Sequence, residues 1–158
     1  MKNIFLRKKQ KAFQELKEGF KNSVYYEIVQ YINFDIFKNL VCGNDNIDCL
    51  DWKQNTYYEK KYQLYFNRFF DIISKWSQEK LKKLLKFATG SSVVPIGGFK
   101  NFSKIGGTFE ICFYEGSDAM LPSAHTCFNT IDIPCYSSIE VFEKKLSMAI
   151  DYEEFGFI

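Results

Sequence analysis

The sequence predicts an α+β fold, with helices packed on a small β-sheet and a short helical segment in front, and three observations lead to this prediction. Apolar residues recur at helical spacing as far as Gly90. Five glycines and a proline then occur between residues 90 and 107, where the helical pattern stops. Short alternating segments follow, and one more helical pattern comes after them. Helices, then strands, then a helix is the order typical of α+β proteins.

The first 46 residues predict helices and a linker. A helix is expected at Lys8–Phe20, where apolar side chains recur every three or four positions. Ser23 can cap a second helix, and Asp35 can cap a third over Ile36–Cys42. Gly43–Asn46 suits a turn and contains nothing that needs burial. It is therefore the predicted linker.

Three further helices are expected before Gly90. A short one lies at Leu50–Asn55, and a longer one at Tyr62–Trp76 has a wide apolar stripe. Ser77 is placed to cap the next helix, and Gly90 follows its end, where a left-handed glycine is common.

Strand signals appear only in the last third. Thr108–Glu115 alternates apolar and polar residues and predicts a strand. Ala124–Phe128 could be a strand or an exposed loop, and Ile131–Ile133 is a second short strand that ends before a proline. Ser138 can cap a last helix.

The chain has five cysteines and one histidine. An odd cysteine count excludes a fully paired disulfide framework, and a single histidine excludes metal sites that need two. No C-x-x-C pair is present, so a reducing cytoplasmic or nuclear setting is expected. No apolar run is long enough to span a bilayer. We therefore expect no metal, no cofactor and no membrane partner.

Charge is unevenly distributed along the chain. Residues 1–104 carry 19 Lys and Arg against 10 Asp and Glu, a net charge of +9, and residues 105–158 carry 2 against 9, a net charge of −7. Without a nucleic-acid-binding motif, the basic part is interpreted as the solvated side of helices, and no nucleic-acid partner is expected. The acidic part suggests a positively charged partner, such as a lysine amine or an Arg-rich tail.

One local pattern points to chemistry. The single histidine, His125, precedes Cys127 by two residues, which in an extended segment places both side chains on one side. A protonated imidazole there would favour the reactive thiolate. A free cysteine is also commonly a small buried apolar residue, so this interpretation stays open. No distant histidine exists to serve as the general base of a papain-like protease.

Thioester exchange suits this pattern better than amide hydrolysis. A thiolate that displaces another thiolate needs no acid to protonate an amine leaving group. A later attack by an amine does require removal of a proton, which a carboxylate can assist. Asp132 is the nearest acidic residue in the sequence, although it could equally be an exposed strand residue.

Several segments together resemble the C-terminal lobe of HECT-type ubiquitin-protein ligases. They occur in the family's order and approximate spacing: Leu84–Gly90, Val94–Phe99, Leu121-Pro122, His125–Asn129, Ile131–Pro134 and Tyr136. Upstream, Leu16–Phe20 and Leu40–Gly43 resemble the last helices of the family's larger N-terminal lobe. The resemblance implies a remnant of that lobe at residues 1–42, a hinge at 43–46 and the C-terminal catalytic lobe at 47–158.

The resemblance also implies roles for particular residues. Cys127 would accept ubiquitin as a thioester and transfer it to a substrate lysine, in an environment shaped by His125 and Thr126, with Asp132 assisting the lysine. The remaining implied residues serve ubiquitin transfer and tail positioning or form the hinge: Phe155, Leu121 and Asn129 for the former; Gly43, Asn44, Asp45 and Asn46 for the latter.

The implied partners are ubiquitin, a lysine-bearing substrate and a ubiquitin-conjugating enzyme, which the family docks through a lobe outside this sequence. The acidic C-terminal part could attract the arginines of the ubiquitin tail. Two alternatives remain: a non-catalytic interaction module derived from a ligase, and a cysteine hydrolase that uses the same cysteine and histidine.

Overall fold

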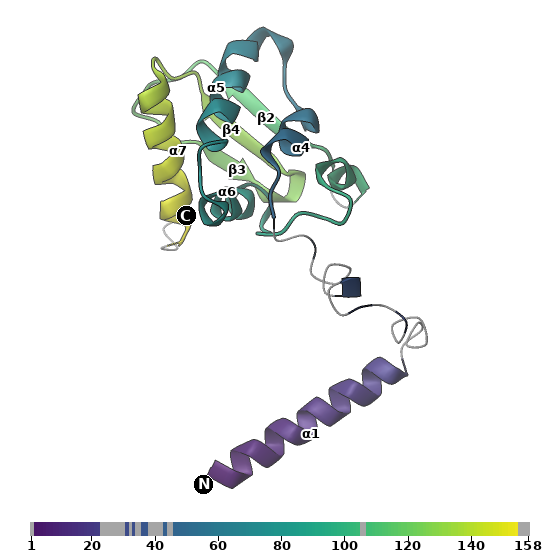
Figure 1. The fold of residues 1–158 in the computed structure, drawn as a ribbon. Coiled ribbons are helices and arrows are strands. Elements are labelled where there is room, and N and C mark those ends of the chain that lie inside the picture. Colours follow the sequence, from purple (N-terminus) through teal and green to yellow (C-terminus); the bar gives the residue numbers. More distant parts are fainter. Residues whose placement is uncertain are drawn as a thin grey trace. The chain divides into compact units, whose positions relative to one another are not determined.

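The computed structural model describes residues 2–22, 31, 33, 36–37, 43, 46–104 and 107–154, and the chain divides into two compact units, residues 1–41 and 42–158 (Figure 1). The first unit contains helix α1, Lys2–Lys21. This confirms the helix predicted at Lys8–Phe20 and extends it toward the N-terminus, because residues 2–7 contain neither glycine nor proline to interrupt it. The predicted helices that follow Ser23 and Asp35 depend on residues outside the described ranges.

The described part of the second unit alternates helices and short strands. Its α-helices are α4 (Cys49–Gln54), α5 (Gln63–Ile73), α6 (Gln78–Thr89) and α7 (Ile139–Glu154). Its strands are β1 (Thr56–Tyr57), β2 (Phe109–Tyr114), β3 (Ser123–His125) and β4 (Thr130–Pro134). Short 3₁₀ helices lie at Lys60–Tyr62, Phe99–Lys104 and Thr126–Phe128. The α+β class predicted from the sequence is confirmed.

The strands form one sheet in the order β1-β2-β4-β3. β2 runs parallel to both β1 and β4, whereas β3 runs antiparallel to β4. Buried residues alternate along β2, at Phe109, Ile111 and Phe113, and this face packs against helices (Figure 1). The edge strands are therefore β1 on one side and β3 on the other.

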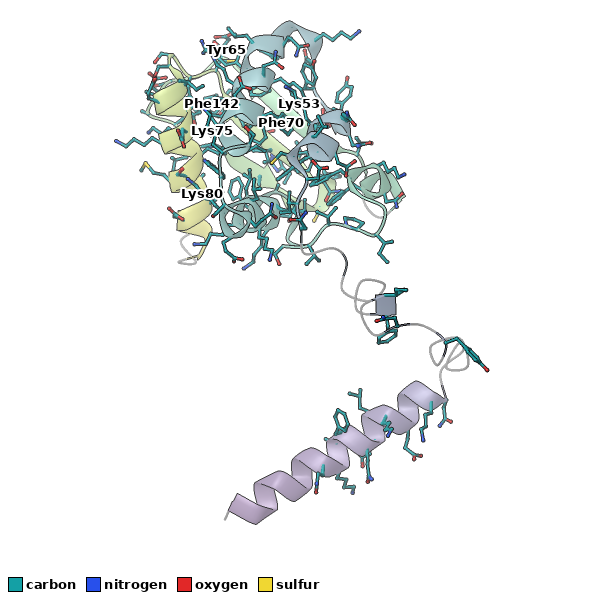
Figure 2. All side chains as sticks on the ribbon, in the orientation of Figure 1. Lys53, Tyr65, Phe70, Lys75, Lys80 and Phe142 are labelled. Atoms are coloured by element: carbon teal, nitrogen blue, oxygen red, sulfur yellow. The ribbon has the colours of Figure 1, made fainter. Side chains whose placement is uncertain are left out.

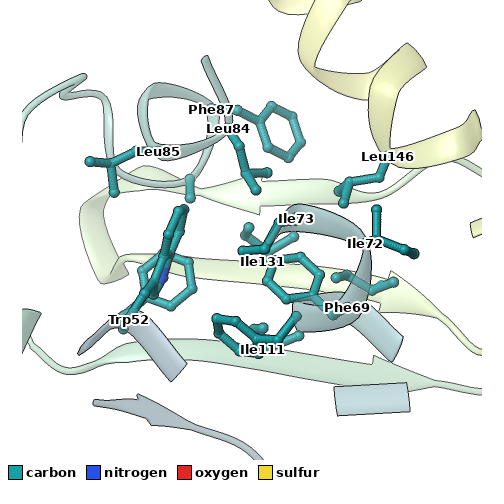
Figure 3. Packing of buried hydrophobic residues seen from close by; sticks show 14 of the residues in the cluster. Trp52, Phe69, Ile72, Ile73, Leu84, Leu85, Phe87, Ile111, Ile131 and Leu146 are labelled. Atoms are coloured by element: carbon teal, nitrogen blue, oxygen red, sulfur yellow. The ribbon is translucent and has the colours of Figure 1, made fainter. Parts of the chain in front are cut away.

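The core between helices and sheet is aromatic and aliphatic (Figure 3). Trp52 is fully buried, stacks on Phe99 with a 4.7 Å centroid separation and meets Phe109 edge-on at 5.2 Å. Phe69 of α5 is fully buried and packs edge-on against Phe70. Such large buried rings supply most of the apolar area that stabilises a domain of this size.

Predicted helix caps are present. Ser77 Oγ accepts a hydrogen bond from the Lys80 N–H at the start of α6, and Gly90 ends that helix in the left-handed conformation with φ of 76°. Ser138 Oγ accepts from the Val141 N–H, 3.2 Å away, at the start of α7. These contacts satisfy backbone donors that have no partner inside the helix.

Two local predictions need correction, and one short strand was not predicted. The helix predicted over Tyr62–Trp76 ends at Ile73, because the following N–H groups of Lys75 and Trp76 bond three residues back instead of four. Ala124–Phe128 is neither one strand nor one loop, since β3 ends at His125 and a 3₁₀ turn follows. The two-residue strand β1 escaped prediction because so short a segment has no period to detect.

Several lysines in the basic part of the chain lie against aromatic rings. Lys53 Nζ is 5.8 Å from the centroids of Phe66 and Phe70, and Lys80 Nζ is 3.9 Å from the centre of Trp76 (Figure 2). A cation over a ring face is attracted by its quadrupole. Part of the positive charge therefore contributes to packing. Nowhere in the described chain is there a helix both long and apolar enough to cross a bilayer.

Candidate functional site

The site is built where β3 turns back into β4, at one edge of the sheet. His125 is the last residue of β3 and lies opposite Thr130, the first residue of β4. The residues between them form a 3₁₀ turn, Thr126–Phe128, followed by Asn129. The turn lies next to the C-terminal end of α6, and a Cβ placed on Gly90 would lie 4.0 Å from the Thr126 Cβ.

Cys127 occupies this turn and is exposed to solvent. The neighbouring Phe128 is also exposed, at 71 % of its surface. Phe128 is one of several large apolar side chains that the described residues expose, so its exposure alone does not mark a site. Both side chains are therefore accessible to a partner that approaches this edge.

The other described cysteines are less suited to react. Burial raises the pKa of the Cys49 thiol, with the Asp48 carboxylate adding to the effect. Burial, assisted by the Glu115 carboxylate, likewise raises the pKa of Cys135. Cys112 has its pKa raised to about 11, by burial first and then by the carboxylates of Glu110 and Asp132. The thiolate is the nucleophilic form of cysteine, and a raised pKa reduces the thiolate fraction of these three residues. Cys127 is the one exposed cysteine among those described.

His125 does not behave as the extended-segment prediction expected. Its Nε2 lies 2.9 Å from Asp132 Oδ2, with 57 % of the histidine side chain and 29 % of the aspartate side chain exposed. The two residues sit diagonally on antiparallel neighbours, because His125 is opposite Thr130 and Ser123 is opposite Asp132. The prediction that His125 and Cys127 share one side of a strand is wrong, since the strand ends between them.

Asp132 therefore has neighbours from two strands. It pairs with the imidazole on β3, and in the parallel register it lies opposite Cys112 of β2. Burial alternates along β2, and Cys112 lies on the less buried face together with Glu110. The Cys112 sulfur is 3.6 Å from Glu110 Oε1. The carboxylate of Asp132 can orient an imidazole and accept a proton from an amine.

The turn rests on buried polar residues. Asn129 and Thr130 are 7 % and 8 % exposed. Asn129 Nδ2 donates to the Gly107 carbonyl over 3.0 Å, and Thr130 Oγ1 donates to the Phe128 carbonyl over 3.2 Å. The sequence did not single out Gly107 as a partner of the turn. Its φ is 101°, a left-handed value that glycine adopts freely, and a Gly-Gly pair in the sequence is a signal for such a conformation.

The other predicted site residues are farther along the chain. Leu121 is half-buried in the loop before β3, where the neighbouring Met120 carbonyl accepts from the Tyr136 hydroxyl over 3.0 Å. Phe155 lies outside the described residues.

Of the predicted hinge, Gly43 and Asn46 are described, whereas Asn44 and Asp45 lie outside the described residues. A Cβ on Gly43 would come within 2.6 Å of the Val94 carbonyl oxygen, so the backbone passes too close for a side chain. The hinge itself stays a prediction.

A cleft of about 330 Å³ lies at the β1 edge of the sheet, away from the turn that holds Cys127. Its lining comes from the end of α4, β1 and the segments before β2: Gln54, Asn55, Thr56, Tyr57, Phe99, Lys100 and Thr108. Because Cys127 follows β3 at the opposite edge, this cleft is separate from the candidate site.

Comparison with known proteins adds information about this arrangement. A family model described as HECT-domain (ubiquitin-transferase) matches residues 1–158. The E3 ubiquitin-protein ligase pub1 of Schizosaccharomyces pombe is 33 % identical over 151 residues, covering 94 % of this chain and 20 % of that protein. The E3 ubiquitin-protein ligase RSP5 of Chaetomium thermophilum is 33 % identical over 153 residues, covering 94 % and 18 %. The chain thus spans about a fifth of the length of these curated relatives.

Proposed function

Since this chain belongs to the HECT-domain family of ubiquitin-transferases, we propose that it accepts ubiquitin as a thioester on Cys127 and transfers it to a lysine. The observation that carries the proposal is the exposure of the Cys127 thiol on a turn, while burial raises the pKa of the other described cysteines. The partners in this proposal are ubiquitin, a ubiquitin-conjugating enzyme and a substrate that offers the lysine.

The first step is an exchange between sulfur atoms. The Cys127 thiolate attacks the carbonyl carbon of an incoming ubiquitin thioester, and the donor's sulfur leaves as a thiolate. One carbon–sulfur bond forms and one breaks, so no amine has to be protonated on departure. This chemistry needs an accessible thiolate and little else, which agrees with an exposed Cys127 whose neighbour His125 pairs with Asp132.

The second step forms an amide. A lysine amine attacks the thioester carbon, the carbon–sulfur bond breaks, and Cys127 leaves as a thiolate while the amine loses a proton. Asp132 is the proposed acceptor or orienting group for that amine, and His125, 2.9 Å away, holds its carboxylate in place. The His125 side chain is exposed and the Asp132 side chain is partly exposed, so a lysine from another protein can reach them.

A ubiquitin derivative with a thiol-reactive group at its C-terminus tests the proposal. We expect one adduct with the full chain, lost in Cys127→Ala and retained in the matched variants Cys112→Ala and Cys135→Ala. Labelling that persists without Cys127, or that is divided among the other cysteines, would contradict the assignment. Absence of labelling would instead favour an interaction module that cannot be loaded.

A further inference from the structure

Asn129 has a left-handed backbone conformation, which asparagine tolerates better than most residues that carry a Cβ. Among the described residues it is the single one other than glycine with a positive φ, 53° with ψ of 40°. Side chains with a Cβ disfavour this left-handed region, and glycine adopts it freely. Asparagine is an ordinary residue at such a position, so a role for the Asn129 side chain is argued from the contacts that its amide makes.

The amide and backbone of Asn129 bind three separate groups. The side-chain Nδ2 donates to the Gly107 carbonyl over 3.0 Å, and the Asn129 carbonyl accepts from the Glu110 N–H over 3.0 Å. Its own N–H points to the Thr126 carbonyl, 3.4 Å away, which closes the turn around Cys127. One residue thus connects the turn to the segment before β2 and to β2 itself.

Burial differs sharply along these few residues. Asn129 is 7 % exposed, whereas Cys127 and Phe128 immediately before it are exposed. A hydrogen bond that is shielded from water is costly to leave unmade, because the Gly107 carbonyl would lose its partner. The exposed thiol of Cys127 therefore lies on a turn whose position is fixed by the buried amide of Asn129.

We propose that Asn129 is a positioning residue for Cys127: its amide ties the 3₁₀ turn to Gly107 and so holds the sulfur in the direction from which it meets the thioester carbon. This role rests on the proposed function. Attack on a carbonyl carbon requires a narrow approach angle. Ubiquitin that is docked elsewhere on the protein cannot adjust its orientation when the sulfur of Cys127 changes position. A small alkylating reagent can approach the sulfur from any side, so its reaction does not depend on the hydrogen bond between Asn129 and Gly107.

The test compares two reactions of the full chain. The first is single-turnover acceptance of ubiquitin, supplied at saturation as the thioester of a small thiol. The second is alkylation of Cys127 by iodoacetamide. For Asn129→Gly, which retains the left-handed backbone but removes the amide, we expect ubiquitin acceptance to fall about tenfold at saturation and alkylation to change less than about twofold. Ubiquitin acceptance should fall further in Asn129→Ala, because the alanine Cβ also disfavours the left-handed backbone conformation.

Asn55→Ala is the matched control. Asn55 Nδ2 also donates to a backbone carbonyl, that of Asp51 at 2.8 Å, but at the β1 edge of the sheet. Both reactions should keep their wild-type rates in this variant. Thermal unfolding checks that each variant folds. If Asn129→Ala does not fold, the comparison is made with Asn129→Gly alone.

Two results would overturn the role. One is a folded Asn129→Gly chain that accepts ubiquitin at the wild-type rate. The other is an equal fall in ubiquitin acceptance and in alkylation, which would mean that the amide only keeps the turn intact. A wild-type chain whose Cys127 is alkylated but never accepts ubiquitin would overturn the proposed function itself, and this role with it.

Discussion

Replacing Asp132 with asparagine should separate the two proposed chemical steps. General-base assistance by a positioned carboxylate contributes about 10²- to 10⁴-fold, and 29 % of this side chain is exposed, so water can partly replace it. We therefore expect transfer to lysine to slow by about 10²-fold, near the low end of that range. Acceptance of ubiquitin by Cys127 involves no amine and should change less than about threefold.

The same substitution should hardly affect folding. The aspartate pairs with a histidine that is 57 % exposed, and exposed pairs contribute less than about 1 kcal/mol to the free energy of unfolding. A shift in melting temperature of more than a few degrees is therefore not expected.

Single-turnover assays measure both steps. The chain is loaded with ubiquitin, separated from the donor and mixed with free lysine, and loss of the thioester is followed on non-reducing gels. Asp151→Asn is the matched control, since Asp151 is an exposed aspartate on α7 whose Oδ1 lies 3.9 Å from Lys83 Nζ. The reasoning would be refuted if Asp132→Asn slowed loading and transfer by the same factor, or left transfer unchanged.

Further predictions concern stability and thiol reactivity. Gln78 binds both backbone groups of Ile47, accepting from its N–H over 2.8 Å and donating to its carbonyl over 3.0 Å. Gln78 is itself exposed, so water can partly replace its side chain, and Gln78→Ala should destabilise the fold by about 1–2 kcal/mol. The melting temperature should fall by about 4–8 °C. An unchanged melting curve would show that these two hydrogen bonds do not stabilise the fold. Phe69→Ala should reduce the free energy of unfolding in urea by about 3–5 kcal/mol, whereas Phe128→Ala, at an exposed ring, should stay within about 0.5 kcal/mol, and equal losses would contradict the assigned burial. The pKa of about 11 keeps the Cys112 thiol protonated near neutrality. Its alkylation rate should therefore rise about 100-fold between pH 8 and pH 10, measured by peptide mass spectrometry, and a plateau below pH 9 would be inconsistent with that pKa.

Features that depend on neighbours in sequence could be predicted. Ser77 and Gly90 mark the two ends of α6, because caps use residues within a few positions of the helix terminus. The alternation around Ile111 identifies β2, because side chains of a strand point alternately to its two faces. The two-residue spacing of His125 and Cys127 left the candidate cysteine open, and the resemblance to the HECT family selected it.

The neighbours of the candidate site could not be predicted in the same way. His125 was expected to act on Cys127, but it pairs with Asp132, seven residues away in sequence. Cys112 lies opposite Asp132 only because β2 and β4 run parallel in one particular register. Nothing local to either residue specifies that register, since it depends on which strands pair and on which faces the helices cover.

The sequence by itself determined the capped ends of α6, the apolar faces and the motif that indicates the family, because caps are local and spacing along the chain encodes which side of each element is buried. Only the tertiary structure decided that Cys127 stands exposed on a turn, that His125 binds Asp132, and that the buried amide of Asn129 binds Gly107. These contacts join residues as many as 22 positions apart. They exist because pairing of the strands, driven by burial of one sheet face, brings separate segments to a common edge.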